Sequence, residues 1–122
     1  MPVRLIALDL DDTLLTPELR IHPANLDAVR RALDSGVDVM LASGRTVESM
    51  MPYAVELGMK GRGLPMICAN GSEVRDVDSG ELTRRLTLSA DACSAAIEAL
   101  AGYGLPVQRS EEHTSELQSR QS

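Results

Sequence analysis

The chain has 122 residues, which is enough for one small domain with one hydrophobic core, and its 43% hydrophobic and 25% charged residues are ordinary for a globular protein. The net charge of −6 makes nucleic acid and anionic membrane unfavourable partners, although a local site could still attract a small anion. Two tyrosines, with neither phenylalanine nor tryptophan, imply a core built from aliphatic side chains.

The two cysteines, Cys68 and Cys93, lie within apolar stretches of the sequence. Two cysteines are too few for a disulfide framework, so we expect both to be buried, reduced thiols. Arg4 and Asp9 interrupt the apolar N-terminal segment, which argues against a signal peptide or a membrane span. A cytoplasmic protein is therefore expected.

The first 71 residues alternate between strand-like and helix-like apolar patterns. Residues 3–10 form a nearly continuous apolar run that predicts a strand buried on both faces, and residues 37–43 and 64–71 predict two further strands. Apolar residues at helical spacing predict helices over 22–36 and 45–58. Strands and helices that alternate with short links are typical of a parallel sheet, so the fold class is α/β with a Rossmann-like core.

The pattern changes after residue 71. Residues 72–88 read as two short strands around an Asp-Ser-Gly turn, which predicts a hairpin. Residues 89–104 predict a helix with Ser89 as its N-cap, and residues 105–108 predict the start of another strand.

The C-terminal segment, residues 109–122, differs in character from the rest of the chain. It is polar and has no strand periodicity, and residues 109–119 match a common sequencing adapter translated in frame. We therefore expect this segment to be non-native and the natural sequence to be interrupted at about residue 108.

Three aspartates, Asp9, Asp11 and Asp12, follow the first predicted strand. Carboxylates at close range repel one another and stay ionised only with a cation nearby. If the chain stays extended, Asp9 and Asp11 point the same way, and such a pair suits Mg²⁺, which takes one or two carboxylates together with phosphate oxygens. A solvated acidic turn is the alternative, but the buried strand before it and Thr13 after it favour a metal site.

The second predicted strand ends in Ser43 and Gly44, directly before a helix. The serine offers a hydroxyl, the glycine allows close approach of the backbone, and the N–H groups of a helix N-terminus bind phosphate. A plain strand-to-helix turn would explain this segment alone. Ligands of open parallel sheets bind at the carboxyl ends of strands, at a switch point in strand order, so two such features at neighbouring strand ends predict a phosphate site.

The segments LDLDDTLL, LASGR and ICANGS, in this order, resemble the haloacid dehalogenase-like phosphatase superfamily, and more narrowly its Cof-type branch with a large α/β cap. The resemblance covers roughly residues 3–108. It rests on the DxDxT motif, on the Ser or Thr after the second strand and on the Asn-Gly pair after the third, matched respectively by Asp9, Asp11 and Thr13, by Ser43, and by Asn70 and Gly71.

The resemblance implies a domain organisation. It places the N-terminal part of the family's core, with the hairpin, at residues 1–87 and the beginning of the inserted α/β cap at residues 88–108. Asp12 stands where the family more often has glycine, and aspartate also tolerates tight-turn backbone.

The resemblance also implies a mechanism. Asp9 would attack phosphorus to form an aspartyl-phosphate, and Asp11 would serve as general acid and then as general base. Asp9 and Asp11 would hold Mg²⁺, which offsets the repulsion between the two anions. The residues implied to bind the phosphorylated substrate are Leu10, Thr13, Ser43, Gly44 and Asn70.

Two elements of the family pattern have no match. The lysine that the family places near the phosphate is missing, because the only lysine, Lys60, precedes the third strand. No pair of late metal-binding aspartates follows residue 91 either. We therefore expect the chain as given to bind Mg²⁺ weakly and to hydrolyse little.

A Mg²⁺-dependent phosphatase of a small phosphorylated metabolite is the favoured function, with no nucleic-acid or membrane partner and no prediction of oligomeric state. One alternative is a receiver-like signalling module that accepts a phosphoryl group, although such modules carry the reactive aspartate after the third strand, where this chain has Cys-Ala-Asn-Gly. The other alternative is a non-catalytic metal-binding remnant.

Overall fold

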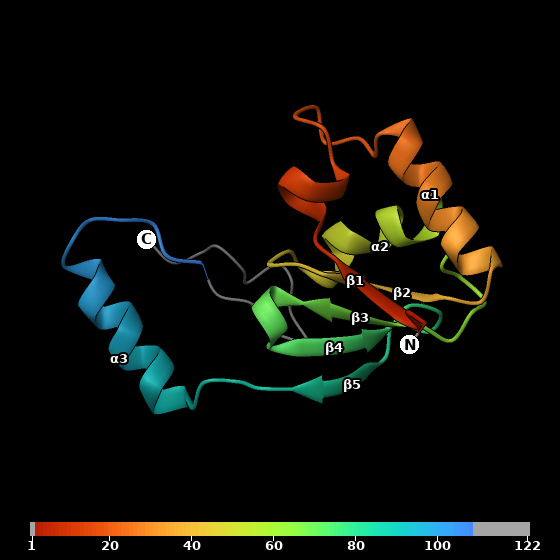
Figure 1. Ribbon diagram of the computed structural model, residues 1–122. Coiled ribbons are helices and arrows are strands. Elements are labelled where there is room, and N and C mark those ends of the chain that lie inside the picture. Colours follow the sequence, from red (N-terminus) through yellow and green to blue (C-terminus); the bar gives the residue numbers. More distant parts are fainter. Residues whose placement is uncertain (1, 109–122) are drawn as a thin grey trace. The chain divides into compact units, whose positions relative to one another are not determined.

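The computed structural model describes residues 2–108 (Figure 1). The described residues divide into two compact units, residues 2–86 and residues 87–108. The segment 109–122, which the sequence predicts to be non-native, lies outside the described residues.

A five-stranded mixed sheet forms the centre of the first unit. Its strands are β1 (Leu5–Leu8), β2 (Asp38–Ala42), β3 (Pro65–Cys68), β4 (Glu73–Asp76) and β5 (Leu82–Arg85), and they lie in sequence order across the sheet. β1, β2 and β3 run parallel, whereas β4 and β5 form an antiparallel hairpin beside β3. The predicted α/β class and hairpin are confirmed.

The strand β1 corrects one sequence-based expectation. It was predicted to be buried on both faces, yet its residues alternate between exposed and half-buried, and the Leu5 side chain is 53% exposed. Within the described residues β1 pairs only with β2, in the register Leu5 to Asp38, so it is an edge strand. Among the described strands the order across the sheet shows no reversal.

Two helices follow the first two strands. α1 (Pro23–Asp34) begins after His22, whose Nδ1 accepts a hydrogen bond from the Ala24 N–H at 3.1 Å. α2 (Val47–Glu56) begins after Thr46, whose hydroxyl accepts from Ser49 N–H, and the helix continues past Pro52. The two crossover helices therefore start at side-chain caps, which satisfy N–H groups that have no partner within a helix.

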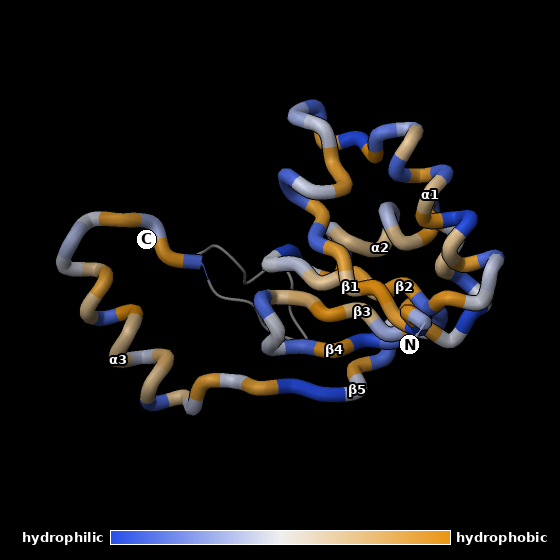
Figure 2. The backbone as a smooth tube through the Cα atoms, in the orientation of Figure 1, coloured by the Kyte–Doolittle hydropathy of each residue, from blue (hydrophilic) through white to orange (hydrophobic). Residues whose placement is uncertain are grey.

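The core of the first unit is aliphatic, as the composition predicts. Figure 2 shows hydrophobic residues along β1, β2 and β3 and a more hydrophilic β4–β5 hairpin. The largest fully buried side chains are Leu10, Leu41, Met50, Leu57, Met59, Met66, Val39, Val77 and Cys68. This core includes side chains of β2, β3 and α2. Their packing holds the ends of these strands in place.

The second unit contains α3 (Ala90–Ala101), which begins at Ser89, whose hydroxyl accepts from Ala92 N–H at 3.1 Å. The predicted helix and N-cap are confirmed, but α3 has no buried residue. Cys93 is half-buried rather than buried, which corrects the expectation for this thiol. Among residues 105–108, where the sequence predicts the start of a strand, Val107 takes part in an isolated β-bridge, and no longer strand is formed there.

None of the helices in the described range is long and apolar enough to cross a membrane.

Candidate active site

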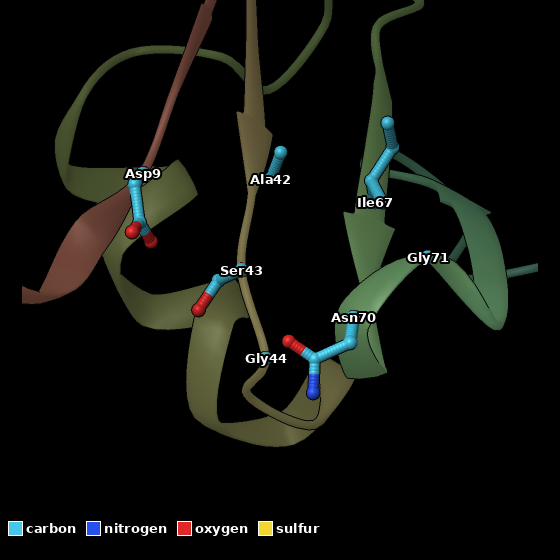
Figure 3. Close-up of a pocket in the computed structure, with 7 residues that line it drawn as sticks. All are labelled: Asp9, Ala42, Ser43, Gly44, Ile67, Asn70 and Gly71. Carbon is cyan, nitrogen blue, oxygen red and sulfur yellow. The ribbon is translucent and has the colours of Figure 1, made fainter.

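A pocket of about 300 Å³ lies where β1, β2 and β3 end. Parallel strands place their carboxyl ends at the same edge of the sheet, so the residues that follow each strand meet there. Figure 3 shows the Asp9 carboxylate and the Ser43 hydroxyl pointing into this space, with the Asn70 amide next to Gly44. The lining residues are Asp9, Ala42, Ser43, Gly44, Ile67, Asn70 and Gly71.

Asp9 follows β1 and keeps an extended backbone, with φ −81° and ψ 160°. Its Oδ1 accepts a hydrogen bond from the Leu10 N–H at 2.7 Å. The other carboxylate oxygen accepts no hydrogen bond from the described residues, so it remains available to a ligand. The Leu10 N–H, for which phosphate binding was predicted, donates to Asp9 in this structure, and the Leu10 side chain is fully buried.

The chain does not remain extended beyond Asp9. Residues Leu10–Leu14 form a tight turn closed by a 2.9 Å hydrogen bond from Leu15 N–H to the Leu10 carbonyl. Asp12 adopts a left-handed backbone with φ 61°, which aspartate tolerates and which agrees with the expectation for this position. Asp11 itself has φ −65° and ψ 131°, but the regular strand ends before it, so the condition of a continuous strand for Asp9 and Asp11 is not met.

Thr13 lies in the same turn, with an exposed side chain. Its carbonyl accepts a 3.5 Å hydrogen bond from the Asn25 side chain at the start of α1. This contact links the turn to α1 through the backbone, and Thr13 does not line the pocket.

Ser43 follows β2 and is a buried polar residue, 8% exposed. Its Oγ accepts a hydrogen bond from the Arg45 N–H at 3.1 Å, which leaves the hydroxyl proton to be donated. Gly44, next along the chain, faces Asn70 so closely that a Cβ at position 44 would lie 2.7 Å from the Asn70 Oδ1. A side chain at position 44 would therefore have to displace the end of the Asn70 side chain.

The turn after β3 is locked against the end of β2. Three successive residues, Ala69, Asn70 and Gly71, have positive φ angles of 49°, 57° and 92°. The Ala69 N–H donates to the Arg45 carbonyl at 2.8 Å, and the Asn70 N–H donates to the Ser43 carbonyl at 3.1 Å. These two hydrogen bonds hold the Asn70 side chain beside the pocket and offset the strain of a left-handed alanine.

Asp11 is paired with Arg45 and does not line the pocket, although its side chain is 47% exposed. The Arg45 Nε and Nη2 donate to the two oxygens of Asp11, each at 2.8 Å. These hydrogen bonds lower the pKa of the Asp11 carboxyl group below its ordinary value, and they raise the pKa of Arg45. The structure therefore pairs Arg45 with the candidate acid–base residue.

The acidic residues near the pocket offer a small donor set for a cation. Among residues 2–108, no group of three or more His, Cys, Asp or Glu side chains is arranged to hold a metal ion. The Asp9 carboxylate has an oxygen to spare, whereas both oxygens of Asp11 are engaged by Arg45. One carboxylate with substrate oxygens and water is a donor set that Mg²⁺ accepts, so the residues present fit this ion.

The structure thus brings some of the predicted site residues together and leaves others aside. Asp9, Ser43, Gly44 and Asn70 line one pocket, whereas Leu10, Asp11 and Thr13 do not. Sequence reasoning missed three lining residues, Ala42, Ile67 and Gly71, of which only Gly71 carried a signal, as part of the Asn-Gly pair.

Comparisons with known proteins agree with this architecture. The chain is 37% identical over 76 residues to the pyridoxal phosphate phosphatase YbhA of Escherichia coli, which covers 62% of this chain and 27% of the relative. It is 38% identical over 84 residues to the 5-amino-6-(5-phospho-D-ribitylamino)uracil phosphatase YcsE of Bacillus subtilis, which covers 69% of this chain and 32% of the relative. The chain thus spans less than a third of the length of either relative.

A solved structure of a haloacid dehalogenase-like hydrolase from Bacteroides thetaiotaomicron superposes with a TM-score of 0.80 at 28% identity, covering 90% of this chain and 41% of that one. The sequence profile of the haloacid dehalogenase-like hydrolases matches residues 6–118, a range that includes part of the segment expected to be non-native. This match covers most of the chain, and the chain therefore belongs to the haloacid dehalogenase-like hydrolase family.

Proposed function

We propose that the protein to which this chain belongs is a Mg²⁺-dependent phosphatase that acts on small phosphorylated metabolites through an aspartyl-phosphate at Asp9. The observation that carries the proposal is the pocket in which the Asp9 carboxylate and the Ser43 hydroxyl share one space at adjacent strand ends. A carboxylate can attack phosphorus there, and a hydroxyl can donate a hydrogen bond to a phosphoryl oxygen.

The residues of the pocket would divide the work of binding and chemistry. Ser43 would bind a phosphoryl oxygen through its unengaged proton, and Asn70 would bind a second oxygen through its side-chain amide. Gly44 would let the substrate approach the backbone. Asp11 would donate a proton to the leaving oxygen and later accept one from water, through a lone pair that its two contacts with Arg45 leave free.

The metal has a limited place in this proposal. Asp9 would hold Mg²⁺ through its carboxylate, and Asp11 through its main-chain carbonyl, because the Asp11 carboxylate is already paired. When bound, Mg²⁺ would neutralise charge on the phosphoryl group and so lower the repulsion that an attacking carboxylate meets.

The relatives support the substrate class at a coarse level. They include phosphatases named for pyridoxal phosphate, for HMP-PP and for a phosphoribitylamino-uracil. These substrates are small organic molecules that carry a phosphate group. The phosphate group is the part that the pocket at the strand ends would bind.

The test is Mg²⁺-dependent release of p-nitrophenolate from p-nitrophenyl phosphate by the full 122-residue chain. We expect slow release that EDTA abolishes and that Asp9→Asn lowers by at least about 1,000-fold, because a carboxamide cannot replace the nucleophile. Borohydride trapping followed by mass spectrometry should place the phosphorylated residue at Asp9.

Asp12→Asn is the matched control for this substitution. It makes the same chemical change three positions away, at an exposed residue with a left-handed backbone that asparagine also adopts. We expect this variant to keep the wild-type rate. An Asp9→Asn chain as active as wild type, or turnover that is indifferent to EDTA, would contradict the proposal.

A further inference from the structure

The contact between Arg45 and Asp11 has the geometry of a rigid clamp. Two parallel hydrogen bonds of 2.8 Å join the guanidinium edge to both carboxylate oxygens across 34 residues of sequence. A two-point contact of this kind fixes the plane of the carboxylate as well as its position. The side chains are 21% and 47% exposed, compared with 75% and 68% for the surface pair of Arg31 and Asp27.

Arg45 is itself held in place by α2. Its Nη1 donates to the Ser49 hydroxyl at 2.7 Å, and its guanidinium carbon lies 5.6 Å from the centroid of the Tyr53 ring. Ser49 and Tyr53 follow Arg45 at intervals of four residues, so they lie on the same face of the helix. The Tyr53 hydroxyl in turn donates to the Leu19 carbonyl at 2.8 Å, which fixes the ring.

All three guanidinium nitrogens of Arg45 are therefore engaged, two by Asp11 and one by Ser49. The Asp11 side chain is exposed even in this contact, and it lies in a turn whose next residue has a left-handed backbone, so no surrounding packing would orient it without Arg45. A carboxylate of that kind can adopt several rotamers, and only some of them face a substrate in the pocket.

We propose that Arg45 is a positioning residue, which orients the Asp11 carboxylate for proton transfer through the two-point contact. Ser49 and Tyr53 hold the guanidinium of Arg45 in place for this contact. This inference rests on the proposed function, in which Asp11 exchanges the proton. Arg45 acts through Asp11, not as a ligand of the phosphate.

The shape of the guanidinium, and not its charge, carries this role. A lysine at position 45 keeps the positive charge but has no planar edge with which to hold both oxygens. If Arg45 served only to attract a phosphate, Arg45→Lys would preserve activity and Arg45→Met would chiefly raise KM. If Arg45 orients Asp11, both substitutions should lower kcat and leave KM nearly unchanged.

The experiment compares wild type, Arg45→Lys, Arg45→Met and the control Arg31→Lys, all in the full chain with Mg²⁺ and p-nitrophenyl phosphate. We expect both substitutions of Arg45 to lower kcat by about 10- to 100-fold, because orientation of a general acid–base residue contributes on this scale. KM should change by less than about 3-fold, and Arg31→Lys should leave both constants unchanged. Thermal melting should confirm that all four chains fold.

Two kinetic outcomes would overturn the proposal. One is an Arg45→Lys chain with the kcat of wild type, since charge alone would then suffice. The other is an Arg45→Met chain that changes KM alone, since Arg45 would then be a substrate ligand.

A second readout does not depend on turnover. The side-chain Nε–Hε of Arg45 donates to Asp11, so its NMR signal should exchange slowly with solvent in wild type and in Asp12→Asn, and rapidly in Asp11→Asn. If the wild-type chain shows no turnover, as the missing lysine and late aspartates would allow, this signal decides whether Arg45 fixes Asp11. Exchange as fast as that of an exposed arginine in the wild-type chain would overturn the inference.

Discussion

The helices of the two regions of the chain, residues 2–86 and residues 87–108, have similar caps and similar apolar spacing, but they differ in how many side chains they bury. Helices in both begin at a side-chain cap and carry apolar residues at helical spacing. All sixteen buried hydrophobic residues among the described positions lie between Leu10 and Val77, whereas α3 buries none. Local pattern therefore predicts that a helix forms, and burial must be supplied by strands or helices that pack against it.

The largest difference between the regions should appear in stability. Leu41→Ala removes a fully buried side chain from β2 and should lower the free energy of unfolding by about 2–5 kcal/mol. Leu100→Ala, at a position in α3 that is 42% exposed, should change it by less than about 0.5 kcal/mol. Urea unfolding of both variants measures these values, and equal losses would break the comparison.

The two cysteines provide the next test, because one lies in each region. Burial raises the pKa of the Cys68 thiol to about 11, so few thiolates form at neutral pH, whereas Cys93 is half-buried. Iodoacetamide should alkylate Cys93 at least about 100-fold faster than Cys68 in the folded chain. A Cys93→Ser chain, which keeps only Cys68, should react at an appreciable rate only after guanidinium is added.

Two glycines, one in each region, differ in what an added Cβ would contact. Gly44 lies against Asn70 of the candidate site, whereas Gly102 lies at the end of α3. Gly44→Ala should push the Asn70 side chain out of place and lower the phosphatase rate by about 10-fold, because the new Cβ would lie 2.7 Å from Oδ1. Gly102→Ala, at the end of α3, places its Cβ 3.6 Å from the Ala99 carbonyl and should have no effect on that rate.

A double variant checks the cause of the loss at Gly44. In an Asn70→Gly background the clash partner is absent, so adding Gly44→Ala should bring no further loss of rate. Additive losses would place the effect of Gly44 elsewhere.

The helix caps offer a smaller contrast. Thr46→Ala removes the cap of α2, which carries buried Met50 and Ala54, and should destabilise the first region by about 1 kcal/mol. Ser89→Ala should instead speed hydrogen exchange of the α3 amides and leave the unfolding of the first region unchanged. A fall in first-region stability with Ser89→Ala would show that the two regions unfold together.

The smallest expected effect lies in the turn of the β4–β5 hairpin. Hydrogen bonds from Ser79 lower the pKa of the Asp76 carboxyl group in the folded chain. The stabilisation that this carboxylate gives is therefore present above its unfolded pKa of about 3.9 and is lost as the pH falls through the folded pKa. Ser79→Ala should raise the Asp76 pKa toward its ordinary value in an NMR titration, and Ser89→Ala should leave it unchanged.

Much of the first region could be predicted because its signals are local. The strands that became β2 and β3, both crossover helices and the hairpin were predicted near their observed ends, since apolar periodicity and turn residues act within a few positions. The burial of β1 could not be predicted from its apolar run, because burial depends on which strands lie beside it. The same reason explains Cys93, whose apolar neighbours form one stripe of α3 with no described partner.

The sequence could predict those residues of the candidate site that directly follow a strand. Asp9 and Ser43 were expected together because parallel strands end at one edge, and they line one pocket. The contact of Asp11 with Arg45 depends on the parallel register of β1 and β2 and on the turn after Asp9, neither of which the motif reveals. The left-handed Ala69 carried no signal, because alanine rarely adopts that backbone.

Because the Arg45 guanidinium lies over the Tyr53 ring, the fluorescence of Tyr53 should respond to movement of Arg45. The chain has two tyrosines and no tryptophan, so tyrosine fluorescence comes from Tyr53 at the candidate site and from Tyr103, which is 77% exposed. Replacing Tyr103 with phenylalanine leaves a single fluorophore against the guanidinium. Its intensity would then report directly, without any added dye, on each rearrangement that moves Arg45.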